Sequence, residues 1–292
     1  MVVTKSRGKK GRYAADLHMH STCSDGELSP TQLVALAHRR GVETIAITDH
    51  DTAEGLPEAL NAAAHSPVRV ISGVELTAFY DREVHILGFF FDPSVPALQA
   101  QFNRQTNIRQ QRVHDICAKL SEMGVDLDAD EILRSADGNV GRPHIAQMLL
   151  KRKYVSNFNE AFQKYLGRHA AAYVDVERIS AESAIDLIHS AGGVAVIAHP
   201  GVEKLDGRLN ALKEMGLDGV EINHPAHKVS TKASLKSQAK RLGLLVSGGS
   251  DMHRRNSPCK LGDLGITGEE LGQLQAAANV HRSRNNMSDY DL

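Results

Sequence analysis

The stretch that decides the fold is DLHMHSTCSDGELSP, residues 16–30. It starts inside an apolar segment, 14–17, that we expect to be a strand, and it ends where helical spacing begins, over 30–40. Successive side chains of an extended segment point to opposite faces, so His18 and His20 share a face and can hold one metal ion. The stretch therefore predicts a strand that delivers metal ligands and then passes into a helix.

The same alternation of short apolar segments with helical stretches extends along most of the chain. Strands are expected at 44–48, 68–72, 194–198, 219–222 and 244–247, a hairpin at 74–80 and 84–91, and helices at 56–64, 181–191, 209–215 and 232–242. The segment 97–170 has no strand pattern, and helices are expected there at 98–123, 129–135, 142–151 and 158–166. This order predicts an α/β fold in which a parallel barrel is interrupted by a helical insertion.

The expected domain organisation has four parts. Residues 1–13 form a disordered basic arm, 14–96 and 171–280 a discontinuous barrel, 97–170 a small helical domain on the substrate side, and 281–292 a frayed polar tail. No apolar run approaches the length of a membrane span, and the first thirteen residues lack the apolar core of a signal peptide. Three scattered cysteines do not make a disulfide framework, so we expect a cytoplasmic protein with no membrane association and no obligate protein partner.

Histidine is unusually frequent, with 15 residues in a chain of 292 that has no tryptophan and a net charge of −1. Ligand-type side chains stand at the ends of successive expected strands: His18, His20, Asp25, His50, Glu75, His85, His199, Asp251 and His253. The carboxyl ends of barrel strands are where such a fold carries its active site. Imidazole and carboxylate without thiolate suit Mn, Fe or Zn in a catalytic site. We therefore expect two to three divalent ions, with Mn as the first choice.

Several motifs, in order along the chain, resemble the PHP (polymerase and histidinol phosphatase) superfamily of metallophosphoesterases. They are DLHMHSTCSDGELSP, AITDHD, GVE, VHILG, VIAHPG and GSDMH, and the resemblance covers about residues 14–255. It implies a distorted (β/α)7 PHP barrel with a trinuclear metal site. The helical insertion resembles small bacterial members that act as 3′,5′-nucleotide bisphosphate phosphatases and as 5′-to-3′ exoribonucleases on short RNA.

The resemblance also implies a role for each ligand-type residue. It puts one metal on His18, His20, Glu75 and Asp251, a second on Asp25, His50 and His253, and a third on Glu75, His85 and His199. A metal-bridging hydroxide would be the nucleophile, with assistance from Asp25, His50 or His227. Asp49 and Asp51 flank His50, and either can orient a ligand or cap the following helix; we expect capping for Asp51.

The substrate side is expected in the helical segment. Arg109 and Arg112 are one helical turn apart, so their guanidinium groups can meet a phosphate together, whereas Arg104 is expected on a solvated face. Arg142 and His144 stand at an expected helix start, where backbone N–H groups favour an anion. His227 matches a substrate-side histidine of the resembled family that would protonate a leaving group.

The sequence therefore predicts a metal-dependent phosphoesterase acting on a nucleotide or short oligonucleotide. The expected reactions are release of the 3′-phosphate from a 3′,5′-nucleoside bisphosphate and stepwise 5′-to-3′ hydrolysis of short 5′-phosphorylated RNA. Hydrolysis of histidinol phosphate or another small phosphate ester is one alternative. A non-catalytic, metal-binding accessory domain is the other, and a ligand set this large argues against it because a structural site rarely needs three ions.

Overall fold

The computed structural model describes residues 13–136, 138–205 and 207–290. Its strands are β1 (Ala15–Asp16), β2 (Thr44–Ala46), β3 (Arg69–Ile71), β4 (Gly73–Phe79), β5 (Glu83–Phe89), β6 (Ile179–Ser180), β7 (Val194–Ile197), β8 (Gly219–Asn223) and β9 (Leu245–Gly248). Its helices are α1 (Pro30–Arg40), α2 (Leu56–Ala63), α3 (Pro96–Glu122), α4 (Ala129–Ser135), α5 (Arg142–Lys151), α6 (Phe158–Ala161), the π-helical turn η1 (Phe162–Leu166), α7 (Ala181–Ser190), α8 (Leu209–Glu214), α9 (Val229–Leu242) and α10 (Gly268–Arg284). The predicted basic arm lies outside the described residues except for Tyr13.

The described strands form two sheets. One is parallel, in the order β1-β2-β3, and the other has the order β6-β4-β5-β7-β8-β9, with β5 antiparallel to both of its neighbours. Single bridges, Met19 to Met252 and His50 to Glu75, connect the two sheets. The predicted α/β class is confirmed. Closure into a seven-stranded barrel stays a prediction, because the strands of the first sheet are only two or three residues long.

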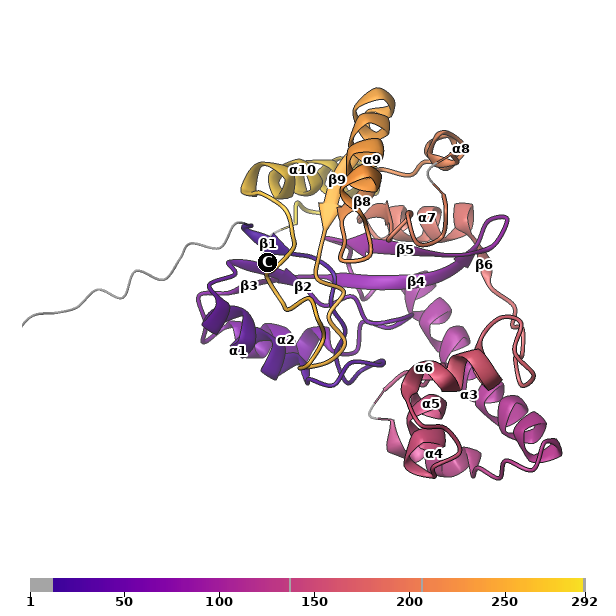
Figure 1. Cartoon of the computed structure of the whole chain (residues 1–292). Coiled ribbons are helices and arrows are strands. Elements are labelled where there is room, and N and C mark those ends of the chain that lie inside the picture. The colour runs from indigo at the N-terminus through magenta and orange to yellow at the C-terminus, as the bar shows by residue number, and fades with distance from the viewer. Residues whose placement is uncertain (1–12, 137, 206, 291–292) are drawn as a thin grey trace, which may run out of the picture.

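Local sequence signals explain where the elements begin and end. Ser29 caps α1 by accepting the N–H of Gln32, Pro30 occupies the first turn, and Gly41 ends the helix with a φ of +73°. The apolar run of β7 is buried at every residue, as expected for a strand covered on both faces. Helices α7, α9 and α10 lie along one side of the larger sheet, whereas α1 and α2 lie beside the smaller one (Figure 1).

The helices from α3 to η1 have a hydrophobic core of their own. Its buried residues run from Val113 to Ala172, and they include Ile116, Leu149 and Leu166. In Figure 1, α4, α5 and α6 gather around the far end of α3, away from the sheets. This separate core supports the prediction of an inserted helical domain.

The C-terminal segment differs from the expected frayed tail over 281–292. Helix α10 continues to Arg284, and Tyr290 is buried with its ring edge-on to Phe90 at 5.1 Å. The Tyr290 hydroxyl accepts the backbone N–H of Ser72 at 2.8 Å. The polar composition of this segment predicted fraying, because composition does not reveal that Tyr290 packs against residues far away in the sequence.

No helix of the described residues is long and apolar enough to cross a membrane.

Candidate metal centre

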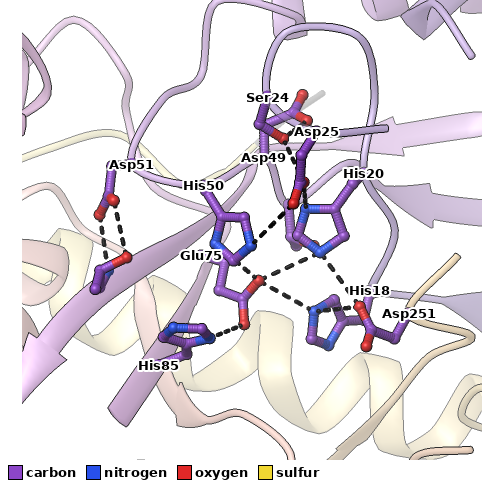
Figure 2. Close-up of polar contacts among 12 residues, drawn as sticks. His18, His20, Ser24, Asp25, Asp49, His50, Asp51, Glu75, His85 and Asp251 are labelled. Carbon is purple, nitrogen blue, oxygen red and sulfur yellow. Dashed lines mark hydrogen bonds and ion pairs between the residues drawn. The ribbon is translucent and has the colours of Figure 1, made fainter. Parts of the chain in front are cut away.

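The nine candidate ligands lie close together, and Figure 2 shows seven of them, Glu75 included. His18 and His20 follow β1, His50 follows β2, Glu75 and His85 lie in β4 and β5, His199 follows β7, and Asp251 and His253 follow β9. Asp25 comes from the loop between β1 and α1. Parallel strands end at the same edge of a sheet, so residues far apart in the sequence meet there.

The backbone around the site is tightly built. A Cβ on Gly249 would lie 2.4 Å from the backbone nitrogen of His18, so only glycine allows the segment after β9 to pass beside β1. His199 and Asp251 both have positive φ, +28° and +48°, which is uncommon for residues with a side chain. Such strain is found where the surrounding structure holds a functional side chain in place.

Glu75 is the centre of the cluster and is almost fully buried. Its Oε1 lies 2.8 Å from His85 Nδ1 and 3.0 Å from His199 Nε2. Its Oε2 lies 3.3–3.4 Å from a nitrogen of each of three further histidines, His18, His20 and His50. One carboxylate therefore faces five imidazole rings.

Two other carboxylates complete the arrangement. Asp251 Oδ1 lies 3.4 Å from His18 Nε2, 3.3 Å from His20 Nε2 and 3.5 Å from His253 Nδ1. Asp25 lies 3.6 Å from His20 Nδ1 and 3.5 Å from His253 Nε2. It lies 3.9 Å from His50 Nε2.

The residues fit divalent cations on two independent grounds. First, buried ring nitrogens lack a hydrogen-bond partner: both nitrogens of His20, Nδ1 of His50 and Nδ1 of His199. Buried polar atoms are normally paired, so these nitrogens are available as ligands. Second, the carboxylates of the site favour positive charge on the groups around them. Burial alone would lower the pKa of His20, but Asp251 and Glu75 raise that pKa to about 10.

The pKa values of His50 and Glu75 are also shifted by burial and by neighbouring charges. Burial lowers the pKa of His50 to about 3, so this imidazole is neutral and ready to ligate. Burial alone would raise the pKa of Glu75, but His50, His85 and His18 hold it well below the usual range. Three carboxylates, of which Glu75 is almost fully buried, thus favour positive charge at this position, and clustered divalent ions would supply it.

All nine candidate ligands fall into overlapping groups whose donor atoms lie within 4.8 Å of one another. The groups are His20-Asp25-His50-His253, His18-His20-Asp251, His18-Glu75-His199 and His50-Glu75-His85. The first two lie where the resemblance puts two of its metals, with His20 near both. His85 and His199 both lie beside Oε1 of Glu75, and these three residues are the ones that would hold a third ion.

Sequence analysis missed Glu221, and the structure adds His224 as a further residue of the site. Glu221 is fully buried, accepts a hydrogen bond from His18 Nδ1 at 2.9 Å, and accepts the N–H of His199 at 2.7 Å. His224 Nε2 lies 3.1 Å from Asp251 Oδ2. The available signal was an acidic residue in the middle of an apolar strand. Such partners orient metal ligands and fix the tautomer of a histidine.

The two acids beside His50 have different roles. The carboxylate of Asp49 accepts hydrogen bonds from Ser21 and Ser24, so it shapes the loop that carries Asp25. The prediction that Asp51 caps a helix is wrong, because α2 has Gly55 at its N-cap position. Asp51 instead accepts hydrogen bonds from Thr77 and Arg109.

A cavity of about 130 Å³ opens beside the cluster, and cationic side chains line it. Its wall includes His50, His85, Asp25, Arg109, Arg112 and Arg142, together with Gly141 and Asn139. Arg109 is held by Asp51, and Arg142 lies 3.4 Å from Glu83. Arg112 differs because its Nε and Nη2 are buried without a hydrogen-bond partner. Burial lowers the pKa of Arg112 to about 10, with repulsion from Arg142 as a further cause.

The two remaining predicted substrate residues do not line this cavity. His144 is in the first turn of α5, where its Nδ1 accepts the N–H of Gly141, and it lines a neighbouring cavity of about 250 Å³. His227 has both nitrogens engaged: Nδ1 donates to the carbonyl of Ile222 and Nε2 accepts the N–H of Gly201. The structure therefore does not present a free proton of His227 to the cavity. Arg104 pairs with Glu177 at the surface, as expected for a solvated face.

Comparisons with known proteins agree with this geometry. The PHP domain family model matches residues 16–176. The chain is 38% identical to a 5′-3′ exoribonuclease of Haemophilus influenzae, over 86% of this chain and 92% of the relative. It is 35% identical to a 3′,5′-nucleoside bisphosphate phosphatase of Chromobacterium violaceum, over 82% of this chain and 86% of the relative.

A solved structure has a fold similar to that of this chain. A protein of Bifidobacterium adolescentis, described as a candidate metal-dependent phosphoesterase, superposes with a TM-score of 0.85 and 30% identity, covering 92% of this chain and 98% of that one. The resemblance stated from the sequence and the expectation of a phosphoric ester hydrolase are both confirmed. The family model matches more than half of the chain, and the exoribonuclease relative aligns with 86% of it. The chain therefore belongs to the PHP domain family.

Proposed function

We propose that this protein is a metal-dependent phosphoesterase that hydrolyses nucleotide phosphate esters. The substrates we propose are 3′,5′-nucleoside bisphosphates, with release of the 3′-phosphate, and short 5′-phosphorylated RNA, degraded from the 5′ end. The observation that carries the proposal is the contact of Glu75 with five imidazoles at the edge of a cavity lined by three arginines. The names of the two relatives support these substrate classes.

The proposed cofactor is two to three divalent ions, with Mn²⁺ as the first choice and Fe or Zn as alternatives. His18, His20, Glu75 and Asp251 would hold one ion, Asp25, His50 and His253 a second, and Glu75, His85 and His199 a third. When bound, such ions lower the pKa of water and neutralise charge on phosphoryl oxygens. The donor set of imidazole and carboxylate without thiolate favours Mn over a structural zinc site.

The chain's own residues fix the orientation of the candidate metal ligands. Glu221 holds Nδ1 of His18, so that Nε2 points toward Glu75 and Asp251. His224 holds Asp251 through the other carboxylate oxygen. These contacts fix ligand orientation before substrate arrives, which removes reorganisation from the chemical step.

Arg112 supports a second phosphate site remote from the scissile bond. Its guanidinium is buried against the cavity, stacks 5.4 Å from the ring centre of Tyr173, and has unpartnered nitrogens. An arginine so placed binds a phosphate through two parallel hydrogen bonds. A substrate with two phosphates, or with a 5′-phosphate besides the scissile ester, supplies that group.

Phosphate release from a substrate panel tests the proposal. The panel holds a 3′,5′-nucleoside bisphosphate, a short 5′-phosphorylated RNA, the same RNA without its 5′-phosphate, and histidinol phosphate. We expect the first two to have the highest kcat/KM. Fastest turnover of histidinol phosphate would select the small-molecule alternative, and no turnover of any ester in the presence of Mn²⁺ would select a non-catalytic domain.

We place the activity in the cytoplasm, which the unpaired state of Cys23, Cys117 and Cys259 supports.

A further inference from the structure

A second group of metal-ligand side chains lies outside the candidate metal centre. It consists of His189 in the last turn of α7, Asp218 immediately before β8, and His281 in α10. Nε2 of His189 lies 2.7 Å from Asp218 Oδ2, and Nε2 of His281 lies 3.1 Å from Asp218 Oδ1. Three elements distant in the sequence thus bring two imidazoles and one carboxylate together.

This group is separate from the candidate metal centre. Asp218 precedes β8, whereas His224, which contacts Asp251, follows the same strand. Five residues of extended chain span about 16 Å. An ion held by Asp218 therefore cannot be shared with the centre around Glu75.

The three side chains are already held in place. Asp218 Oδ2 also accepts the backbone N–H of Ala195 at 2.9 Å, which fixes the carboxylate against the start of β7. The rings of His189 and His281 stack with centres 3.9 Å apart. The side chains of the three residues are 12–20% exposed, so water can reach the group and fill remaining coordination positions. Among the described residues, Asp218 forms ion pairs with these two histidines and with no lysine or arginine.

We propose that His189, Asp218 and His281 bind one Zn²⁺ ion that fastens α10 to α7 and to the start of β8. Two imidazoles and one carboxylate are a known zinc donor set, with water in the remaining position. One donor atom from each of the three residues lies within 4.8 Å of the other two, so small side-chain movements bring them to the roughly 3.3 Å spacing of tetrahedral ligands with zinc bonds of about 2.0–2.1 Å. Binding requires the lone pair of each Nε2, so the proton that each ring donates to Asp218 would move to Nδ1 of the same ring. Because an ion that binds only the folded chain stabilises it, Zn²⁺ will raise the melting temperature.

Metal content of matched variants tests the proposal in the full-length protein loaded with its catalytic metals. The variants are His281→Gln and His189→Gln, and the control is His38→Gln, whose side chain is exposed on α1. Each protein is dialysed against Zn²⁺ at micromolar concentration, and all bound metals are counted by mass spectrometry. We expect both cluster variants to hold one equivalent less metal than the wild type and the control, and to lose the part of the Tm increase that Zn²⁺ gives.

Two features keep the test decisive. The candidate catalytic ligands are the same in all four proteins. Exchange of Mn²⁺ for Zn²⁺ at the catalytic centre therefore does not change the difference in total bound metal between the proteins. Circular dichroism without zinc identifies a variant that fails to fold, and the second cluster variant then gives the answer alone. Equal metal content and equal Tm increase in wild type and folded cluster variants would overturn the proposal and leave a hydrogen-bonded His-Asp-His contact.

Discussion

Glu221 accepts a hydrogen bond from Nδ1 of His18 at 2.9 Å, and neither side chain is exposed to solvent. A histidine that donates through Nδ1 has its lone pair on Nε2, which here faces Glu75 and Asp251. The second oxygen of Glu221 accepts the N–H of His199. One carboxylate on β8 therefore positions candidate ligands that follow β1 and β7.

Replacing Glu221 with Gln should weaken metal binding without removing a ligand. The amide keeps one acceptor, but its NH2 group must face either His18 or the backbone N–H of His199. Loss of such an orienting partner costs about 10- to 100-fold in metal affinity or activity. Activity measured against Mn²⁺ concentration should shift to higher metal by this factor and recover at saturation. Glu182→Gln, an exposed change on α7, is the control, and an unchanged metal requirement in Glu221→Gln would show that this contact is only structural.

Replacing Glu75 or Asp251 should abolish turnover. Each carboxylate contacts at least three histidines of the cluster, so its loss removes the charge that holds the ions and places the phosphoryl group. We expect Glu75→Gln and Asp251→Asn to lower kcat by about three or more orders of magnitude. Steady-state kinetics with parallel metal analysis makes the measurement. Near-normal turnover by either variant would exclude that residue from the reaction centre.

The arginines of the cavity should discriminate between substrates with one and two phosphates. Arg112→Ala should lower kcat/KM for a 3′,5′-nucleoside bisphosphate by about 10- to 150-fold, equivalent to about 1.5–3 kcal/mol of charge-assisted hydrogen bonding. A simple aryl phosphate should lose little. Arg142→Ala should act in the same direction, and Arg104→Ala, on the exposed face of the same helix as Arg112, is the control. Equal losses on both substrates would assign these arginines to the fold or to the common reaction centre.

Arg109 should show a mixed effect, because it is already paired. Its guanidinium is bonded to the buried carboxylate of Asp51, so Arg109→Ala leaves that carboxylate without its cation. We expect Arg109→Ala to lower the melting temperature as well as turnover, unlike Arg112→Ala. A thermal unfolding scan of the two variants distinguishes them, and equal melting temperatures would contradict a structural role of the Asp51 contact.

Tyr290 should contribute to stability through its hydroxyl. In Tyr290→Phe, the buried N–H of Ser72 loses its acceptor, at a cost of about 1–3 kcal/mol. Tyr154→Phe is the matched control, since its hydroxyl bonds Asp126 near the surface. Denaturant unfolding measures both changes. If the two variants are equally stable, the segment after α10 does not dock as described.

The parts of the fold that could be predicted from sequence depend on neighbours in the chain. The bounds of α1 follow from Ser29, Pro30 and Gly41, which act within one turn of each helix end. The candidate ligands were recognisable for a similar reason, because most of them stand in or just past a short apolar run. They converge on Glu75 because the ends of β1, β2, β7 and β9 meet beside the antiparallel strands β4 and β5.

The parts that could not be predicted depend on contacts over long sequence separations. Asp51 occupies a position where capping is locally favourable, and only the folded chain brings Arg109 to it, 58 residues away. Glu221 and His18 are 203 residues apart, and Tyr290 and Ser72 are 218 apart. No local rule distinguishes these polar residues from solvated ones, because their partners are set by packing.

Metal dependence tests the central claim most directly. The purified protein is stripped with a chelator, its metal content is measured, and phosphate release from a 3′,5′-nucleoside bisphosphate is followed before and after Mn²⁺ is added. We predict no turnover by the stripped protein, and full recovery when two to three equivalents of Mn²⁺ per chain are bound. Turnover that persists in the metal-free protein, or a chain that binds no metal and gains no activity from it, would contradict the account.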